Sequence, residues 1–231
     1  MLVRFTPLMI VLVLLSSVMA RESFAQQKAA NPRQIRANNI VNAMMERENA
    51  ENADFNAHLT ELNAHGWPLE LKNLDTAQVS SSVLRTLGFL EYLKKCHASS
   101  DSLDRAFTDS LFILEAEAPG GKLEKSLRLV KETFTEERAA YNNFLGSLED
   151  LFNSVLNALL YLQSEPYKVT GDKFAFVHPK ASKHYMQLMK KVDEAMKEET
   201  KTNDALKKAT AEANARVKQQ NTASDDDFIE E

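Results

Sequence analysis

Glycine is the residue that this chain lacks most clearly. Six glycines occur in 231 residues, under about 3% against roughly 7% in average proteins. Phosphate-binding loops, doubly wound sheets and turn-rich β-sandwiches all need glycine, so these folds are disfavoured. The abundant residues are good helix formers such as Ala, Leu, Glu and Lys. The composition therefore predicts an all-α fold.

Cysteine and an excess of positive charge are also missing. Cys96 is the only cysteine, so it is either buried as a small apolar residue or available to pair with another chain. The net charge of the chain is −5, whereas a nucleic-acid-binding surface needs clustered Lys and Arg. We therefore expect no internal disulfide and no nucleic-acid partner.

Common catalytic motifs are absent as well. The sequence contains no Gly-x-Ser-x-Gly, no Gly-x-Gly-x-x-Gly, no phosphate loop, no His-Glu-x-x-His and no Glu-x-x-His. Cys96-His97 is only half of the Cys-x-x-Cys-His motif that attaches haem covalently. The chain is therefore predicted to be no enzyme, with no catalytic residue and no cofactor.

The first 25 residues have the layout of a secretory signal peptide. Arg4 precedes an apolar run over 5–19, and small residues follow. The run is shorter than the roughly 20 residues that span a bilayer. Cleavage is expected after Ala20 or Ala25, the second being preferred, and an uncleaved N-terminal anchor is the alternative. We expect an exported chain, periplasmic or secreted, with no stable membrane span once the leader is removed.

Helix breakers divide the remaining chain into four long segments. Pro and Gly cluster near residues 32, 66–68, 119–121 and 166–179, leaving segments 33–65, 69–118, 122–165 and 180–220. Their apolar residues recur at alternating spacings of three and four, the pattern of helices packed at about 20°. Short connections make consecutive helices antiparallel. The prediction is an elongated up-down-up-down four-helix bundle with coiled-coil-like packing, one domain over 26–220, followed by a disordered acidic tail over 221–231.

Two local patterns qualify this outline. Residues 98–101 (Ala-Ser-Ser-Asp) look like a break with a fresh N-cap, which leaves open whether the second segment is one helix or two. Residues 167–177 alternate apolar and polar side chains around Gly171-Asp172, which predicts a small β-hairpin between the third and fourth helices.

Aromatic and histidine residues gather at one predicted end of the bundle, because the first and third connections of such a bundle lie together. The residues expected there are His65, Trp67, Tyr167, Phe174, Phe176, His178 and His184. Three interpretations are open. The aromatics cap the core, the cluster forms a surface for a ligand or partner, or the histidines hold a metal ion with nearby carboxylates.

Two glutamates occupy apolar positions of the repeat. Glu48 and Glu199 lie at similar distances from the predicted aromatic end, as do Gly88 and Gly146. Facing carboxyl groups in a core share a proton, bind a cation or find polar partners. The layer either sets helix register, as a buried Asn does in coiled coils, or is a functional site, or is exposed if the seam is assigned wrongly.

These observations predict an exported, non-enzymatic binding module whose partner is a protein or a small ligand. The alternative is a bundle that binds a metal or non-covalent haem through the histidines or through the layer of Glu48 and Glu199. The oligomeric state is not predicted.

Overall fold

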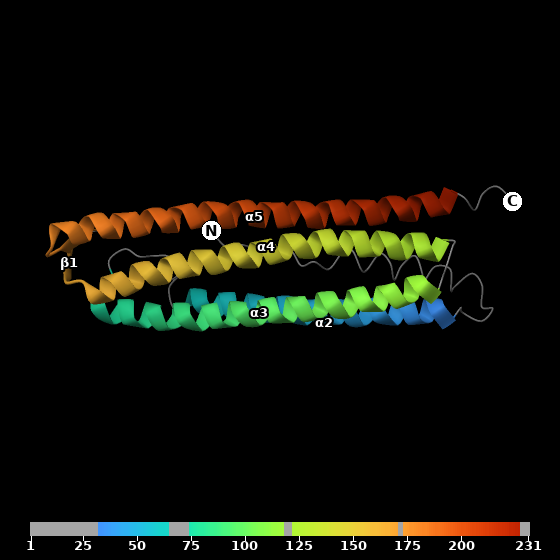
Figure 1. Cartoon of the computed structure of the whole chain (residues 1–231), viewed down its shortest axis with the longest axis horizontal. Helices are drawn as coiled ribbons and strands as arrows, with labels where there is room; N and C mark the ends of the chain where they lie inside the picture. Colours follow the sequence, from blue (N-terminus) through green and yellow to red (C-terminus); the bar gives the residue numbers. More distant parts are fainter. Residues whose placement is uncertain (1–31, 65–73, 118–121, 171–172, 227–231) are drawn as a thin grey trace. The chain divides into compact units, whose positions relative to one another are not determined.

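The computed structural model describes residues 32–64, 74–117, 122–170 and 173–226. The fold is all-α with one small hairpin between the last two helices, as predicted (Figure 1). The helices are α2 (Pro32–Ala64), α3 (Thr76–Glu117), α4 (Lys122–Ser164) and α5 (Pro179–Asp226). Strands β1 (Tyr167–Thr170) and β2 (Lys173–Phe176) connect α4 to α5. The predicted leader, with both of its cleavage positions, lies outside the described residues.

The second segment is one continuous helix, which answers the question that residues 98–101 left open. A serine hydroxyl at an N-cap position accepts a hydrogen bond from a backbone N–H in the first turn of the helix that follows. It favours a new helix there when it has no other hydrogen-bond partner. Here Ser99 donates a hydrogen bond to Glu51 Oε1 on α2, and Ser100 accepts one from Arg138 on α4. Both hydroxyls are used in contacts between helices, and the backbone remains helical.

Short-range signals explain where the helices begin and end. Asp75 and Gln78 form a reciprocal capping box before α3, with both backbone-to-side-chain hydrogen bonds at 2.8 Å. Pro166 follows α4 and Pro179 opens α5, as proline's fixed φ and missing N–H favour. α5 continues to Asp226, beyond the predicted boundary at residue 220.

The structure divides into two compact units, each containing part of every helix. Unit 1 comprises Met1–Phe55, Ser99–Tyr141 and Ala205–Glu231. Unit 2 comprises Asn56–Ala98 and Asn142–Asp204, and therefore contains the hairpin.

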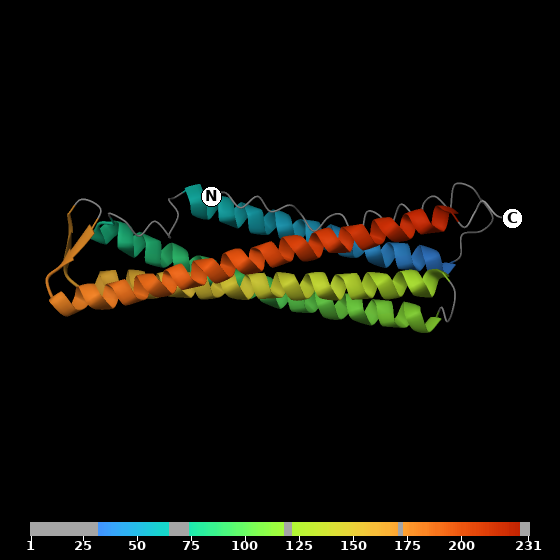
Figure 2. The ribbon, with the colours of Figure 1, turned by 90° about the horizontal axis from the view of Figure 1, so that it is seen from above.

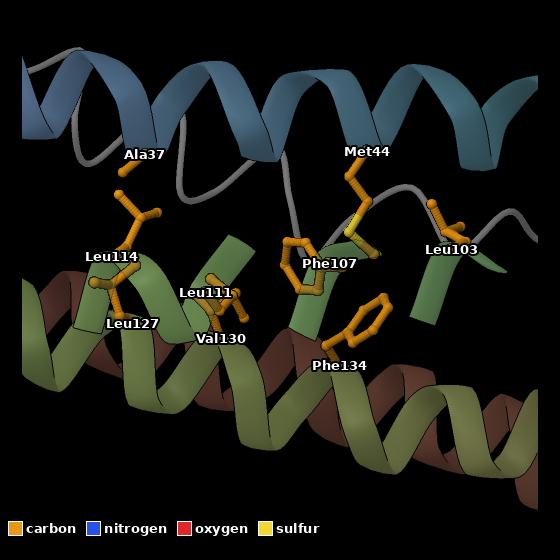
Figure 3. Packing of buried hydrophobic residues seen from close by; sticks show 9 residues of the cluster. All are labelled: Ala37, Met44, Leu103, Phe107, Leu111, Leu114, Leu127, Val130 and Phe134. Atoms are coloured by element: carbon orange, nitrogen blue, oxygen red, sulfur yellow. The ribbon is translucent and has the colours of Figure 1, made fainter. Parts of the chain in front are cut away.

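The core of unit 1 is formed by α2, α3 and α4. Ala37 and Met44 project from α2 toward side chains of α3 and α4 (Figure 3). Phe107 and Phe134 meet there with ring centroids 4.3 Å apart. The other members of this cluster are Leu103, Leu111, Leu114, Leu127 and Val130. Buried apolar area of this kind is the main favourable term in folding.

The core of unit 2 depends most on α4. The aromatic pair Phe89 and Phe152 joins α3 to α4 with centroids 4.6 Å apart. The repeat of spacings three and four in segment 122–165 places nine residues on one seam, and all nine are buried: Leu127, Val130, Phe134, Glu137, Tyr141, Phe144, Leu148, Leu151 and Val155. The periodicity of this helix therefore identified its core face in both units.

Three residues that the same kind of apolar repeat predicts for the core of their helices are exposed. Leu87, Leu160 and Met196 lie at one edge of the buried stripe of their helices rather than at its centre. A helix with 3.6 residues per turn drifts from a strict seven-residue repeat, so residues at the edge of the stripe turn toward solvent.

Cys96 is half-buried and not in a disulfide. Within the described ranges, no helix is long and apolar enough to cross a membrane.

Candidate functional site

The hairpin is held against unit 2 by its aromatic side chains. Phe174 and Phe176 each lie 5.4 Å, centroid to centroid, from the ring of Tyr185 on α5. Tyr167 stacks edge-on against Phe174 at 5.0 Å, and its hydroxyl donates a hydrogen bond to the carbonyl of Leu74 at 3.0 Å. The hairpin lies beside the start of α3 in the second view of the ribbon (Figure 2). The aromatics are therefore half-buried supports of the hairpin.

The backbone of the hairpin is regular. β1 and β2 pair antiparallel, with Tyr167 opposite Phe176 and Thr170 opposite Lys173. The N–H of Val177 donates to the carbonyl of Pro166, which extends the pairing by one step. Since an isolated two-stranded hairpin is marginal in water, its aromatic contacts with α5 stabilise it. The same aromatic contacts fix the position of the exposed residues on the hairpin and at the start of α5.

Aliphatic and lysine side chains form the exposed surface around this hairpin. Val177 is 64% exposed and Met186 is 70% exposed. On α5 the exposed residues Lys180, Lys183, Met186 and Lys190 follow one another at spacings of three and four, so they share one face of the helix. We use the name hairpin surface for the exposed residues Lys168, Val177, Lys180, Lys183, Met186 and Lys190; Val169 is left out because it lies on the face of the hairpin that carries Phe174.

The histidines that the structure describes have different neighbours. His184 lies 4.7 Å from the ring of Tyr161, His178 is exposed, and His58 stacks on Tyr92 at 3.7 Å. Among residues that the structure describes, no group of three or more His, Cys, Asp or Glu side chains could hold a metal ion. His65 and Trp67 belong to the predicted cluster but lie outside the described residues.

A second site lies buried inside unit 1 and involves all four helices. We use the name polar cluster for Glu48, Ser100, Asp104, Glu137, Arg138 and Thr210. Arg138 stands at its centre: its Nε donates to Asp104 Oδ1 at 2.6 Å and its Nη2 donates to Ser100. The guanidinium carbon lies 5.0 Å from the centre of the Tyr141 ring, a cation–π distance.

The two glutamates of this cluster have different partners. Glu137 Oε1 accepts a hydrogen bond from the Thr210 hydroxyl on α5 at 2.7 Å. Glu48 Oε1 lies 3.8 Å from Arg138 Nη1, too far for a hydrogen bond. This buried oxygen has no hydrogen-bond partner among the described residues.

Burial changes the protonation of both carboxyl groups. Burial raises the pKa of Glu48 to about 8; the Arg138 guanidinium opposes this rise, while Glu137, Glu51 and Asp104 add to it. Burial also raises the pKa of Glu137 to about 7, against the hydrogen bond from Thr210 and the charge of Arg138. Near neutral pH, Glu48 is therefore mainly protonated. The positive charge of Arg138 then faces fewer than three full negative charges from Glu48, Glu137 and Asp104.

The structure agrees with part of the predicted buried layer. Glu48 is 5% exposed, as its seam position implies, whereas Glu199 is half-buried and belongs to unit 2. The facing of these two glutamates stays a prediction. A Cβ built on Gly88 or Gly146 would meet no described atom within 4 Å, so these glycines mark no close approach of helices.

The sequence repeat places Glu137 at a seam position of α4, but it gives no signal for the burial of Arg138. Arg138 follows Glu137 directly and lies outside the repeat of apolar residues at spacings of three and four. Its burial depends on Ser100 and Asp104, which lie more than thirty residues away on another helix. Only the packing of the helices brings these residues together.

Comparison with known proteins identifies no relative. No protein-family model, no curated protein and no solved structure matches this chain.

Proposed function

We propose that this chain is an exported, non-enzymatic binding module that contacts its partner through the hairpin surface. The observation that carries the proposal is the exposure of Val177 and Met186 beside a well-anchored hairpin. Phe174 and Phe176 pack against Tyr185, and Tyr167 donates a hydrogen bond to the carbonyl of Leu74. These contacts hold the surface in one conformation before a partner binds.

The burial of the polar cluster supports a structural role for its residues rather than a catalytic one. Glu48 and Arg138 are each 5% exposed at their side chains, and a catalytic acid or base must reach a proton on its substrate. The contacts of Arg138 with α2 and α3 instead define which faces of the helices meet, as buried polar groups do in coiled coils.

Site-specific photo-crosslinking tests the proposal with the full exported chain. A photoreactive side chain replaces Val177 or Met186 in turn, and Leu84 serves as the matched control because it is also apolar and 71% exposed, on α3 of the same unit. We expect an adduct from the first two positions and none from Leu84. Equal labelling at all three positions, or none at any, would refute the hairpin surface as a binding site.

A further inference from the structure

Positive charge is concentrated in the hairpin and the start of α5. Residues 166–191 contain six lysines and one acid, Asp172, which is a net charge of +5. Since the whole chain carries −5, the remaining residues carry −10. The chain therefore contains a strongly basic segment although its net charge is negative.

The lysines of this segment that the structure describes are on the outside. Lys168, Lys180, Lys183, Lys190 and Lys191 are all exposed. Lys190 makes an ion pair with Glu194 at 3.6 Å, which is solvent-exposed and therefore weak.

Apolar side chains are interspersed among these charges. Met186 lies three residues after Lys183 and four before Lys190 on the same face of α5, and Val177 precedes the helix. Exposed lysine and aliphatic side chains together supply the two terms that bind a segment at the headgroup level of a bilayer, which are electrostatic attraction to anionic lipids and burial of apolar area.

The residue types favour a lipid surface over a protein. Lysine is depleted in protein–protein interfaces, whose centres are rich in Trp, Tyr and Arg. The exposed members of the hairpin surface are lysines, one valine and one methionine. Lysines near an anionic membrane each contribute about 1 kcal/mol to binding, and no pocket is required.

We infer that the hairpin surface docks reversibly on a membrane that carries anionic lipids, an inference that rests on the proposed binding function and names its partner. The lysines contact the lipid headgroups, and Val177 and Met186 enter the interface between headgroups and acyl chains. The chain is then peripheral, in keeping with described helices that are too polar to span a bilayer.

Vesicle co-sedimentation of the full exported chain tests the inference. The vesicles contain phosphatidylcholine with or without phosphatidylglycerol. We expect binding to the anionic vesicles alone, with weakening as salt is added because exposed charges are screened.

Two triple variants locate the surface. Lys180→Gln, Lys183→Gln and Lys190→Gln remove charge from the hairpin surface, whereas Lys197→Gln, Lys201→Gln and Lys208→Gln remove the same charge from exposed positions farther along α5. The first triple variant should lose roughly 100-fold in partitioning, which is about 3 kcal/mol at 1.4 kcal/mol per tenfold change. The second should lose less than about threefold.

A second pair tests the apolar contacts at constant charge. Val177→Ser with Met186→Ser should weaken partitioning roughly tenfold, while Leu84→Ser leaves it unchanged. Far-UV circular dichroism checks that every variant keeps its helices.

Four outcomes would overturn the inference: no vesicle binding, equal binding to both vesicle types, equal losses in the two triple variants, or binding to poly-glutamate but not to vesicles. If one of them occurs while Val177 and Met186 still crosslink to a protein, the membrane is wrong and the binding module stands. If crosslinking also fails at both positions, the proposed function falls with it.

Discussion

Replacing Glu48 with Gln should stabilise the protein above neutral pH and leave its stability in acid unchanged. The side chain is 5% exposed, and its carboxyl group has a pKa of about 8 in the folded chain against 4.5 for an ordinary glutamate. Between these two values the folded state holds a proton that the unfolded state has released. The contribution of Glu48 to the free energy of unfolding therefore falls as pH rises from 4.5 to about 8 and is constant below this range.

The size of the effect follows from the two pKa values. Their separation corresponds to a ceiling of about 5 kcal/mol at about 1.4 kcal/mol per pKa unit. Relaxation around the charged carboxylate reduces this ceiling, so we expect Glu48→Gln to gain about 2–5 kcal/mol above pH 8. Glu137, with a pKa of about 7, still titrates in the variant, so part of the pH dependence remains between 4.5 and 7.

Urea unfolding followed by far-UV circular dichroism, at a series of pH values on either side of this range, measures the difference. Glu46→Gln is the matched control, because Glu46 is exposed on the same helix. Parallel pH profiles for the wild type and Glu48→Gln would refute the assignment of a buried, mainly protonated Glu48. An equal gain in Glu46→Gln would show a general charge effect instead.

Three further predictions concern stability. Arg138→Met should destabilise the chain by about 3–5 kcal/mol in urea unfolding, because it leaves buried acids without their cation; a loss below about 1 kcal/mol would contradict the central role of Arg138. Gly88→Ala and Gly146→Ala should each raise stability by about 0.5–1 kcal/mol, since helix propensity improves and the new Cβ meets no described atom; destabilisation in thermal melts would show hidden crowding. Tyr167→Phe removes the hydrogen bond to Leu74 and should cost about 1 kcal/mol. Its hairpin amides should exchange faster with deuterium, and unchanged exchange would mean that the bond does not anchor the hairpin.

Sequence periodicity was most informative where one helix contacts neighbours along its full length. α4 follows this rule, and all nine of its predicted seam positions are buried. Prediction was weaker at the edges of a stripe, where Leu87, Leu160 and Met196 are exposed. Burial at an edge depends on how far the neighbouring helix reaches around, and no local pattern contains that information.

Ser99 and Ser100 show a second limit of local patterns. A run of small polar residues favours an N-cap when only neighbouring residues are considered. In the folded chain the same hydroxyls meet Glu51 and Arg138, which are distant in sequence. The hydrogen bonds gained between helices make the continuous helix the better solution.

The amino-acid sequence by itself determined the helical class, the number of long helices and the hairpin between the last two. These properties depend on composition, breakers and spacing, which act over a few residues. The tertiary structure alone decided that Arg138 is buried beside Glu48, that the hairpin aromatics support the fold, and that Val177 and Met186 remain exposed among lysines. Each of these depends on which side chains from distant segments meet, and packing sets that outcome only once the helices are assembled.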